Sequence, residues 1–233
     1  MIVNIWSDVR CPYCYIGKRK FEAALEKFPH KDQVEVSWHS FQLDPTLKTQ
    51  TDLNLYDYFV DRKGFSREQA VKMHSQVTKT AKEVGLNFNF NHAVVVNSFN
   101  AHRLIQLAKT KGLGDAAEEQ LFKAYFTDGK NIDDYETLLK IGGSIGLEED
   151  ELRKMLSSKK FENEVKKDEL KVQAIGVNGV PFFVFNNQYA VSGAQSPETF
   201  LQTLEKSWEE FEKTKNPLIT VEGETCSVDG NCS

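Results

Sequence analysis

The sequence predicts an α/β fold in which a βαβ unit and a ββα unit are separated by a large all-helical insertion. Strand patterns lie near the two ends of the chain, and the stretch from about residue 52 to residue 175 is almost entirely helical in pattern. A Cys-x-x-Cys pair follows the first strand directly. We therefore assign residues 1–45 and 176–215 to one discontinuous domain, residues 46–175 to the insertion, and residues 216–233 to a tail with a second cysteine pair.

The first forty residues read as strand, helix and strand. Residues 2–7 are mostly apolar and predict a buried strand that ends at the turn-like Asp8. Apolar side chains then recur at helical spacing from Tyr13 onwards, which predicts a helix ending near Pro29. Residues 34–39 alternate between apolar and polar side chains, the period of a half-buried strand.

The insertion shows the caps and apolar stripes of several helices. Residues 66–69, Ser-Arg-Glu-Gln, form a capping box at the start of one helix. A second stripe covers residues 101–108, and two further helix starts lie at residues 115–118 and 133–136. A last stripe over residues 161–175 ends at a glycine. Such stripes are more typical of a packed core than of a ligand site.

Strand patterns return after this last helix. Residues 180–185 predict a strand opened by a proline, and Asn186-Asn187 is a plausible two-residue hairpin turn. Residues 188–191 predict the partner strand. A final helix is expected from Ser196, with Pro197 at its first position.

Composition and charge exclude several classes of partner. Apolar residues make up 40% of the chain, charged residues 27%, and the formal net charge is −5 without a basic face. Nucleic acid and anionic membranes are therefore poor candidates as partners. No apolar run approaches the roughly 20 residues of a membrane span, and the first residues lack the pattern of a secretory signal, so we expect a cytoplasmic protein.

Cys11 and Cys14 are the candidate catalytic residues. The thiolate is the attacking species in disulfide exchange, and the N-terminus of a helix favours it through unpaired N–H groups and a partial positive charge. Cys11 stands at the predicted junction between strand and helix, and Cys14 follows about one turn later. Pro12 suits a first helical turn because the N–H it lacks would be unpaired there. Three basic residues add nearby positive charge: Arg10, Lys18 and Arg19.

The motif by itself has other interpretations, half of a zinc site or two inert core cysteines. Its context favours redox chemistry, because the pair lies between a strand and an amphipathic helix, where a redox motif of this kind is expected. We therefore interpret Cys11 as the nucleophile and Cys14 as the more buried resolving thiol.

Gly179-Val180-Pro181 precedes the returning strand, where a cis proline has a clear use. X–Pro bonds are cis in only about 5–6% of cases, but here a cis proline removes one N–H from the ladder and turns the preceding backbone outward. Val180 then pairs with an extended substrate segment as an added strand would. We predict a cis bond; the alternative is a trans proline that begins an edge strand.

Three segments together resemble the DsbA-like branch of the thioredoxin superfamily and, more narrowly, FrnE-type proteins. These are Asp8 to Gly17 (DVRCPYCYIG), Asn97 to Leu104 (NSFNAHRL) and Gly176 to Val184 (GVNGVPFFV). The resemblance covers nearly the whole chain. It implies a thioredoxin-like fold whose helical insertion roofs the active site, and dithiol–disulfide exchange or isomerisation on protein substrates.

The resemblance also implies a second, auxiliary redox pair near the C-terminus, which Cys226 and Cys232 match. The pair could shuttle electrons to or from Cys11 and Cys14, or form an inert ring that pins the tail. A four-cysteine zinc site using both pairs is a further alternative, and it would silence the nucleophile.

Four residues near these motifs are candidates for proton transfer or for a purely structural role. His102 and Arg103 lie in the segment that the resemblance places near the active site. Asp8 follows the first predicted strand and His39 is the last residue of the second, and both are candidates to assist proton transfer near Cys14. A satisfied helix residue, or a carboxylate that accepts backbone N–H bonds at the turn, is the alternative in each case.

These observations predict a thiol–disulfide oxidoreductase or isomerase that acts on protein substrates. Cys11 attacks a substrate disulfide, the mixed disulfide is held against Val180, and Cys14 releases the product. We expect no bound cofactor and no metal, and glutathione is a candidate redox partner. The predicted substrate-binding residues are Pro12, Tyr13, Val180 and Pro181.

Two other classes of function stay open. Relatives implied by the resemblance include glutathione-using isomerases and kappa-class transferases, which carry a serine at the position of Cys11. This sequence keeps both cysteines, which favours redox chemistry over a glutathione-dependent isomerase or transferase acting on a small molecule. The other alternative is a non-catalytic adaptor that uses the scaffold to bind a protein.

Overall fold

A four-stranded mixed sheet with the order β2-β1-β5-β6 is formed by two strands near the start of the chain and two strands near the end of the described residues. The structure is a computed structural model, and it describes residues 1–215. β1 (Ile2–Ser7) pairs in parallel with β2 (Glu35–Ser40) and antiparallel with β5 (Phe182–Phe185), and β6 (Tyr189–Ser192) pairs antiparallel with β5. This arrangement confirms the predicted α/β class.

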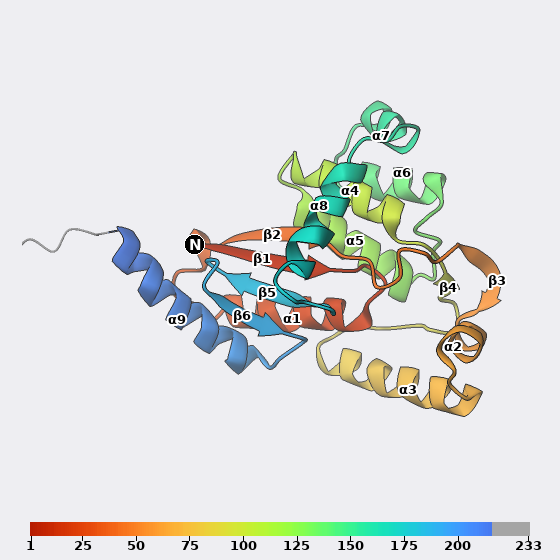
Figure 1. Ribbon diagram of the computed structural model, residues 1–233, viewed down its shortest axis with the longest axis horizontal. Helices are drawn as coiled ribbons and strands as arrows, with labels where there is room; N and C mark the ends of the chain where they lie inside the picture. The colour runs from red at the N-terminus through yellow and green to blue at the C-terminus, as the bar shows by residue number, and fades with distance from the viewer. Residues whose placement is uncertain (216–233) are drawn as a thin grey trace, which may run out of the picture.

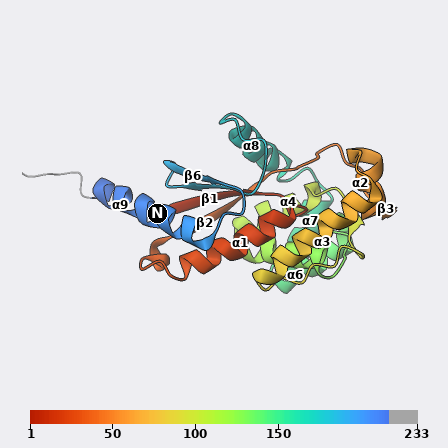
Figure 2. The same ribbon diagram turned by 90° about the horizontal axis from the view of Figure 1, so that it is seen from below.

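Helices cover both faces of this sheet. α1 (Pro12–Leu25) and α9 (Pro197–Lys215) pack together on one face, and α8 (Glu162–Gln173) lies over the other (Figure 2). The alternation along β5 explains the two layers. Phe183 and Phe185 join Phe200 of α9 in one aromatic core, whereas Phe182 packs with Val172 of α8.

The insertion leaves the sheet after β2 and returns through α8 (Figure 1). Its remaining elements are β3 (Gln50–Asn54), α2 (Leu55–Lys63), α3 (Arg67–Glu83), β4 (Val94–Val95), α4 (Phe99–Lys109), α5 (Gly114–Phe126), α6 (Tyr135–Ser144) and α7 (Glu149–Leu156). The prediction of an all-helical insertion is corrected by β3 and β4, which form a two-stranded antiparallel sheet. β3 is mostly polar and exposed, and β4 has two residues, so neither shows a strand pattern.

Several local predictions are confirmed. Ser66 and Gln69 form a reciprocal capping box at the start of α3. Asn186 and Asn187 both have positive φ, as a type I′ turn between β5 and β6 requires. β5 begins at Phe182 and not at Val180, two residues later than predicted.

One hydrophobic core runs from the sheet into the insertion. Tyr15 of α1 stacks on Phe122 of α5 with 4.8 Å between the ring centroids, and Trp38 of β2 donates its indole N–H to Asp115 of α5 at 3.0 Å. The proposed domain boundaries stay a prediction. Within residues 1–215 no helix has the length and apolar character needed to cross a membrane.

Candidate active site

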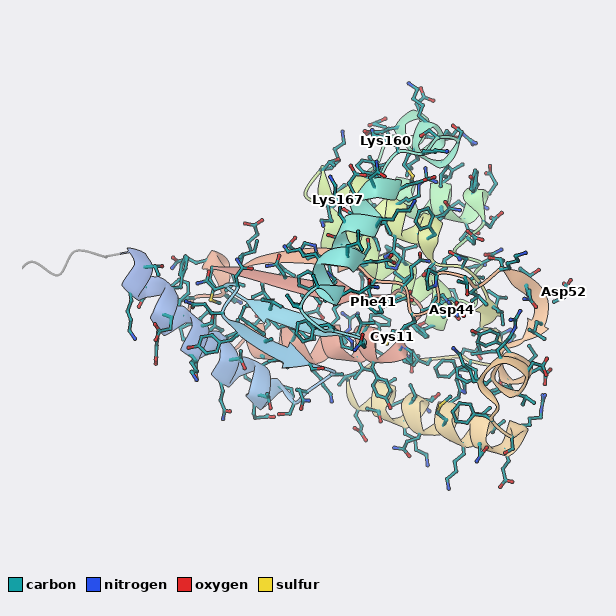
Figure 3. All side chains as sticks on the ribbon, in the orientation of Figure 1. Cys11, Phe41, Asp44, Asp52, Lys160 and Lys167 are labelled. Atoms are coloured by element: carbon teal, nitrogen blue, oxygen red, sulfur yellow. The ribbon has the colours of Figure 1, made fainter. Side chains whose placement is uncertain are left out.

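Cys11 lies at the N-cap of α1, where the chain leaves β1. Its N–H donates to the carbonyl of Asp8 at 2.8 Å, and its own carbonyl accepts from Cys14 N–H at 3.0 Å. Pro12 is the first helical residue, and the side chain of Cys11 caps no N–H. The Cys11 sulfur therefore stands at the end of α1 that carries the unpaired N–H groups (Figure 3).

Cys14 lies one turn further along α1 and is 1% exposed. Both cysteines are free thiols. Burial, together with a hydrogen bond to Cys11, raises the pKa of Cys14 well above its usual value. Cys11 is 5% exposed and lines an open hollow, while Cys14 is not part of that wall. The two thiols therefore differ in access.

The Val180–Pro181 segment lies directly opposite Cys11. The peptide bond between these residues is cis, and the Cys11 thiol donates to the carbonyl of Val180 at 3.5 Å. Pro181 also approaches α1 at Gly17, where an added Cβ would lie 3.0 Å from Pro181 Cγ. Two segments about 170 residues apart in the sequence are thus brought together at one sulfur.

Comparison with known proteins identifies the relationship. The family described as DSBA-like thioredoxin domain matches residues 2–205 of the chain. The chain belongs to this family. A crystal structure of the probable DsbA oxidoreductase SCO1869 from Streptomyces coelicolor is 36% identical, covers 100% of this chain and 98% of that chain, and superposes with a TM-score of 0.85.

Two other similar proteins share less of the sequence. The uncharacterized protein YwbO of Bacillus subtilis (strain 168) is 25% identical over 202 residues, which cover 85% of this chain and 92% of YwbO. The cytosolic disulfide reductase DsbM from Pseudomonas aeruginosa, solved with GSH, shares the fold at a TM-score of 0.60 and 16% identity, covering 94% of this chain and 100% of DsbM. Family membership supports an oxidoreductase enzyme.

The predicted cations separate into two groups in this DsbA-like chain. Lys18 is buried and forms ion pairs with Glu22, Asp115 and Glu119, and Arg19 pairs with the first and last of these carboxylates. Their charges are therefore compensated away from the sulfur. Arg10 instead lines the hollow beside Cys11, and its Nε and Nη1 atoms are buried without a hydrogen-bond partner.

A buried acid–base cluster lies behind the Cys11 turn. Asp8 is fully buried, accepts N–H bonds from Arg10 and Leu43, and lies 3.6 Å from Nε2 of the fully buried His102. Burial opposes the charged forms, but the two charges face one another, so the pKa of Asp8 is lowered and that of His102 is raised. Glu118 of α5 joins this cluster with both carboxylate oxygens unpaired, and burial raises its pKa to about 8.

His39 and Arg103 form hydrogen bonds with residues outside the buried acid–base cluster. His39 Nδ1 lies 2.7 Å from Asp168 of α8, so the ring ties β2 to the helix that precedes the Val180–Pro181 segment. Arg103 donates to Asn100 and, through Nε, to the carbonyl of Lys160 at 2.9 Å. Both contacts are those of residues that hold helices in place.

The remaining predicted residues divide between the hollow and the tail. Pro12 and Tyr13 line the hollow with Cys11, and Tyr13 is exposed. Cys226 and Cys232 lie outside the described residues. Sequence reasoning missed the far wall of the hollow, on α2 and α3, because amphipathic stripes there look like ordinary core.

Proposed function

We propose that this protein is a thiol–disulfide oxidoreductase that exchanges disulfides with protein substrates through Cys11 and Cys14. The observation that carries the proposal is the arrangement of the two thiols: Cys11 at the N-cap of α1, facing an open hollow and the carbonyl of Val180, and Cys14 buried one turn behind it. Relationship to a probable DsbA oxidoreductase supports the reaction class.

The reaction proceeds in two exchanges. The Cys11 thiolate attacks one sulfur of a substrate disulfide, so that a Cys11–substrate bond forms, the substrate bond breaks, and the leaving sulfur takes the electron pair and then a proton. Cys14 next loses its proton and attacks the sulfur of Cys11. The Cys11–Cys14 disulfide forms and the second substrate thiol leaves, so the substrate is reduced by two electrons and the protein is oxidised by two. The reverse sequence oxidises a dithiol.

The burial of Cys14 suits the resolving role. A thiol whose pKa is raised stays protonated at neutral pH and does not compete with Cys11 for incoming disulfides. Val180 and Pro181 supply a main-chain edge against which an extended substrate segment can lie, and Pro12 and Tyr13 supply its other side.

Glutathione is the redox partner that we propose for returning the pair to its working state. The P. aeruginosa DsbM structure that shares this fold was solved with GSH. A cytoplasmic location and an auxiliary role of Cys226 and Cys232 are further parts of the proposal.

Trapping of the mixed disulfide tests the function. The full-length variants Cys14→Ser and Cys11→Ser are mixed with a peptide disulfide and analysed by mass spectrometry without reductant. Cys14→Ser should accumulate a Cys11–peptide adduct, the wild type should pass through it, and Cys11→Ser should form none. An unreactive Cys11 would support the adaptor instead, and turnover of a small molecule by Cys14→Ser without disulfide exchange would support an isomerase or transferase.

A further inference from the structure

Asn178 and Gly179 form the only Asn-Gly pair in the sequence. They lie in the loop that joins α8 to β5 (Figure 1), and both are exposed and outside any helix or strand. Asparagine is chemically labile, and glycine has no side chain to hinder the approach of its main-chain nitrogen to the preceding amide. The pair therefore has the composition and the exposure of a deamidation site.

The hydrogen bonds around this pair leave both reacting groups accessible. Within residues 1–215, the Gly179 N–H donates no hydrogen bond, and its nitrogen is the atom that must attack. The Asn178 amide donates to the carbonyl of Gly176 at 3.4 Å, which is longer than a usual N–H···O bond. A Cβ added at Gly179 would meet nothing within 4 Å, so the loop has space to bring the nitrogen to the amide carbon.

Deamidation of this pair needs only water as a co-reactant. The Gly179 nitrogen attacks Cγ of Asn178, the bond between Cγ and the amide nitrogen breaks, and ammonia leaves with the proton of the Gly179 N–H. Water then opens the resulting cyclic imide. Attack at Cγ gives aspartate, and attack at the main-chain carbonyl of residue 178 gives isoaspartate, in which the main chain runs through Cβ and Cγ. Nothing is oxidised or reduced.

The main chain on either side of the pair is anchored. The Val177 N–H donates to the last turn of α8 at 3.3 Å, and the Pro181 carbonyl accepts from the Gly193 N–H at 2.8 Å. Between these anchors the Val180 carbonyl lies 3.5 Å from the Cys11 sulfur. Isoaspartate adds one carbon to the main chain of this short segment. The extra length must be taken up at Val180 and the two residues before it.

We propose that Asn178–Gly179 is a site of spontaneous deamidation and that isoaspartate formed there slows disulfide exchange at Cys11. The effect on rate rests on the exchange proposed above, whereas the modification itself does not. Displacement of a reacting group by about 1 Å can cost on the order of hundredfold in rate, and one added main-chain carbon is long enough to cause it. The loop thus makes the activity of the protein decline with its age.

Peptide mapping tests the modification. The full-length protein is incubated at physiological temperature and mildly alkaline pH, digested and analysed by mass spectrometry, with isoaspartate separated from aspartate by chromatography. Asn97 is the internal control, since it also precedes a small residue, Ser98. Its amide donates to the Leu47 carbonyl and accepts from the Phe99 N–H, both at 2.7 Å. We expect conversion at Asn178 and none at Asn97; equal behaviour of the two would overturn the site.

Rate measurements test the effect on exchange. The incubated protein is reduced afresh, which removes any cysteine oxidation, and is then mixed with a peptide disulfide in a stopped-flow instrument. The amplitude of the fast phase should fall in proportion to the isoaspartate content, and the modified molecules should react on the order of tenfold or more slowly.

Two variants separate the lengthened main chain from other causes. Asn178→Gln should keep its rate through the same incubation, because its longer side chain would have to close a less favourable six-membered ring. Freshly prepared Asn178→Asp carries the new charge without the longer main chain. It should react at close to the rate of the unincubated wild type, because salt screens an exposed charge.

The outcomes also separate this proposal from the proposed function. An unchanged rate in protein that carries isoaspartate at position 178 would overturn the proposal, and so would an equal loss of rate in Asn178→Gln. A slow Asn178→Asp would assign the effect to charge and contradict the argument from main-chain length. If the unincubated wild type does not react with the peptide, disulfide exchange itself fails, and peptide mapping still decides whether Asn178 is modified.

Discussion

Glu118 is the residue whose environment departs most from that of an ordinary surface carboxylate. It is fully buried, both of its oxygens are unpaired, and its pKa is raised from 4.5 to about 8. Its neighbour Glu119 is partly exposed, bonds to Tyr15 and Arg19, and has a lowered pKa. Ionisation of these two adjacent glutamates therefore has opposite effects on the stability of the folded state.

Glu118→Gln should stabilise the protein at neutral pH. The folded state binds the Glu118 proton more tightly than the unfolded state, so this contribution is fully present below pH 4.5 and is lost as the pH rises towards 8. Glutamine has no proton to lose, so the variant does not undergo this pH-dependent loss of stability. The difference in free energy of unfolding between variant and wild type should grow from near zero at pH 4.5 to about 3 kcal/mol at pH 7. Urea unfolding across this pH range measures the difference in free energy of unfolding.

Glu119→Gln is the matched control, and the sign of its effect is reversed. The lowered pKa of Glu119 means that its contribution is present above its unfolded value and is lost as the pH falls. This variant should be less stable than the wild type at pH 7, with a gap that closes on acidification. A constant difference at all pH values for Glu118→Gln would contradict the buried, protonated state.

The candidate site was predictable at residue scale only where one short segment carries the signal. Cys11 and Cys14 stand out because of their spacing and the strand before them. The sequence does not reveal Asp168 as the partner of His39, because Asp168 lies 129 residues away and is one of many acidic residues on helix surfaces. The directions of the basic side chains near the motif depend on contacts with α5, and the sequence does not predict where α5 lies relative to α1.

At the scale of elements, the contact between α1 and the Val180–Pro181 segment sets the geometry of the site. Gly17 makes this contact possible, because a Cβ there would lie 3.0 Å from Pro181 Cγ and 3.5 Å from Phe183 Cζ. The distance to Pro181 Cγ is shorter than an ordinary van der Waals contact, so the proline ring would have to shift by a few tenths of an ångström, whereas the distance to Phe183 is an ordinary contact.

Gly17→Ala should slow mixed-disulfide formation by on the order of tenfold to hundredfold, because displacement of Pro181 moves the Val180 carbonyl away from Cys11. Stopped-flow measurement with a peptide disulfide gives the rate. Gly143→Ala on α6 is the control: an added Cβ meets nothing within 4 Å, so the rate should be unchanged and stability should rise by roughly 0.5–1 kcal/mol. A wild-type rate in Gly17→Ala would show that this contact does not position the segment.

Elements with strong local signals were predicted, and those held by distant contacts were not. The cap at Ser66 and the positive-φ pair Asn186 and Asn187 depend on their own residues and neighbours. β3 and β4 form a sheet only because residues about 40 positions apart meet, and their sequences are too polar or too short to show it. The start of α8 at Glu162 follows from a positive φ at Phe161, which the apolar stripe does not reveal.

The whole molecule is held together across the junction between sheet and insertion. Lys18 of α1 is buried against Asp115 and Glu119 of α5, and Tyr15 donates its hydroxyl to the latter at 2.6 Å. Because Lys18 is buried, separating α1 from α5 would leave its charge without these partners, so neither part can leave without loss to the other.

The protein should therefore unfold in a single transition. All three tryptophans, Trp6, Trp38 and Trp208, lie outside the insertion and are buried, so their fluorescence reports on the sheet and its flanking helices. Far-UV circular dichroism is dominated by helices, most of which belong to the insertion. The two curves should coincide in urea. An earlier loss of helical signal would show that the insertion unfolds independently.

The general architecture was predictable from the sequence because the order of strands and helices already implies a sheet interrupted by helices. The hollow beside Cys11 was not predictable. Its walls come from α1, α2, α3 and the end of α5, and each contributes residues that would serve equally well in a closed core.

The most direct test of the central claim is the redox equilibrium of Cys11 and Cys14. The full-length protein is equilibrated in a series of glutathione redox buffers, free thiols are trapped by alkylation, and both cysteine pairs are mapped by mass spectrometry. We predict a reversible Cys11–Cys14 couple between about −120 and −270 mV. Cysteines that remain reduced and unreactive throughout the series, or that are recovered with zinc attached, would contradict a working oxidoreductase.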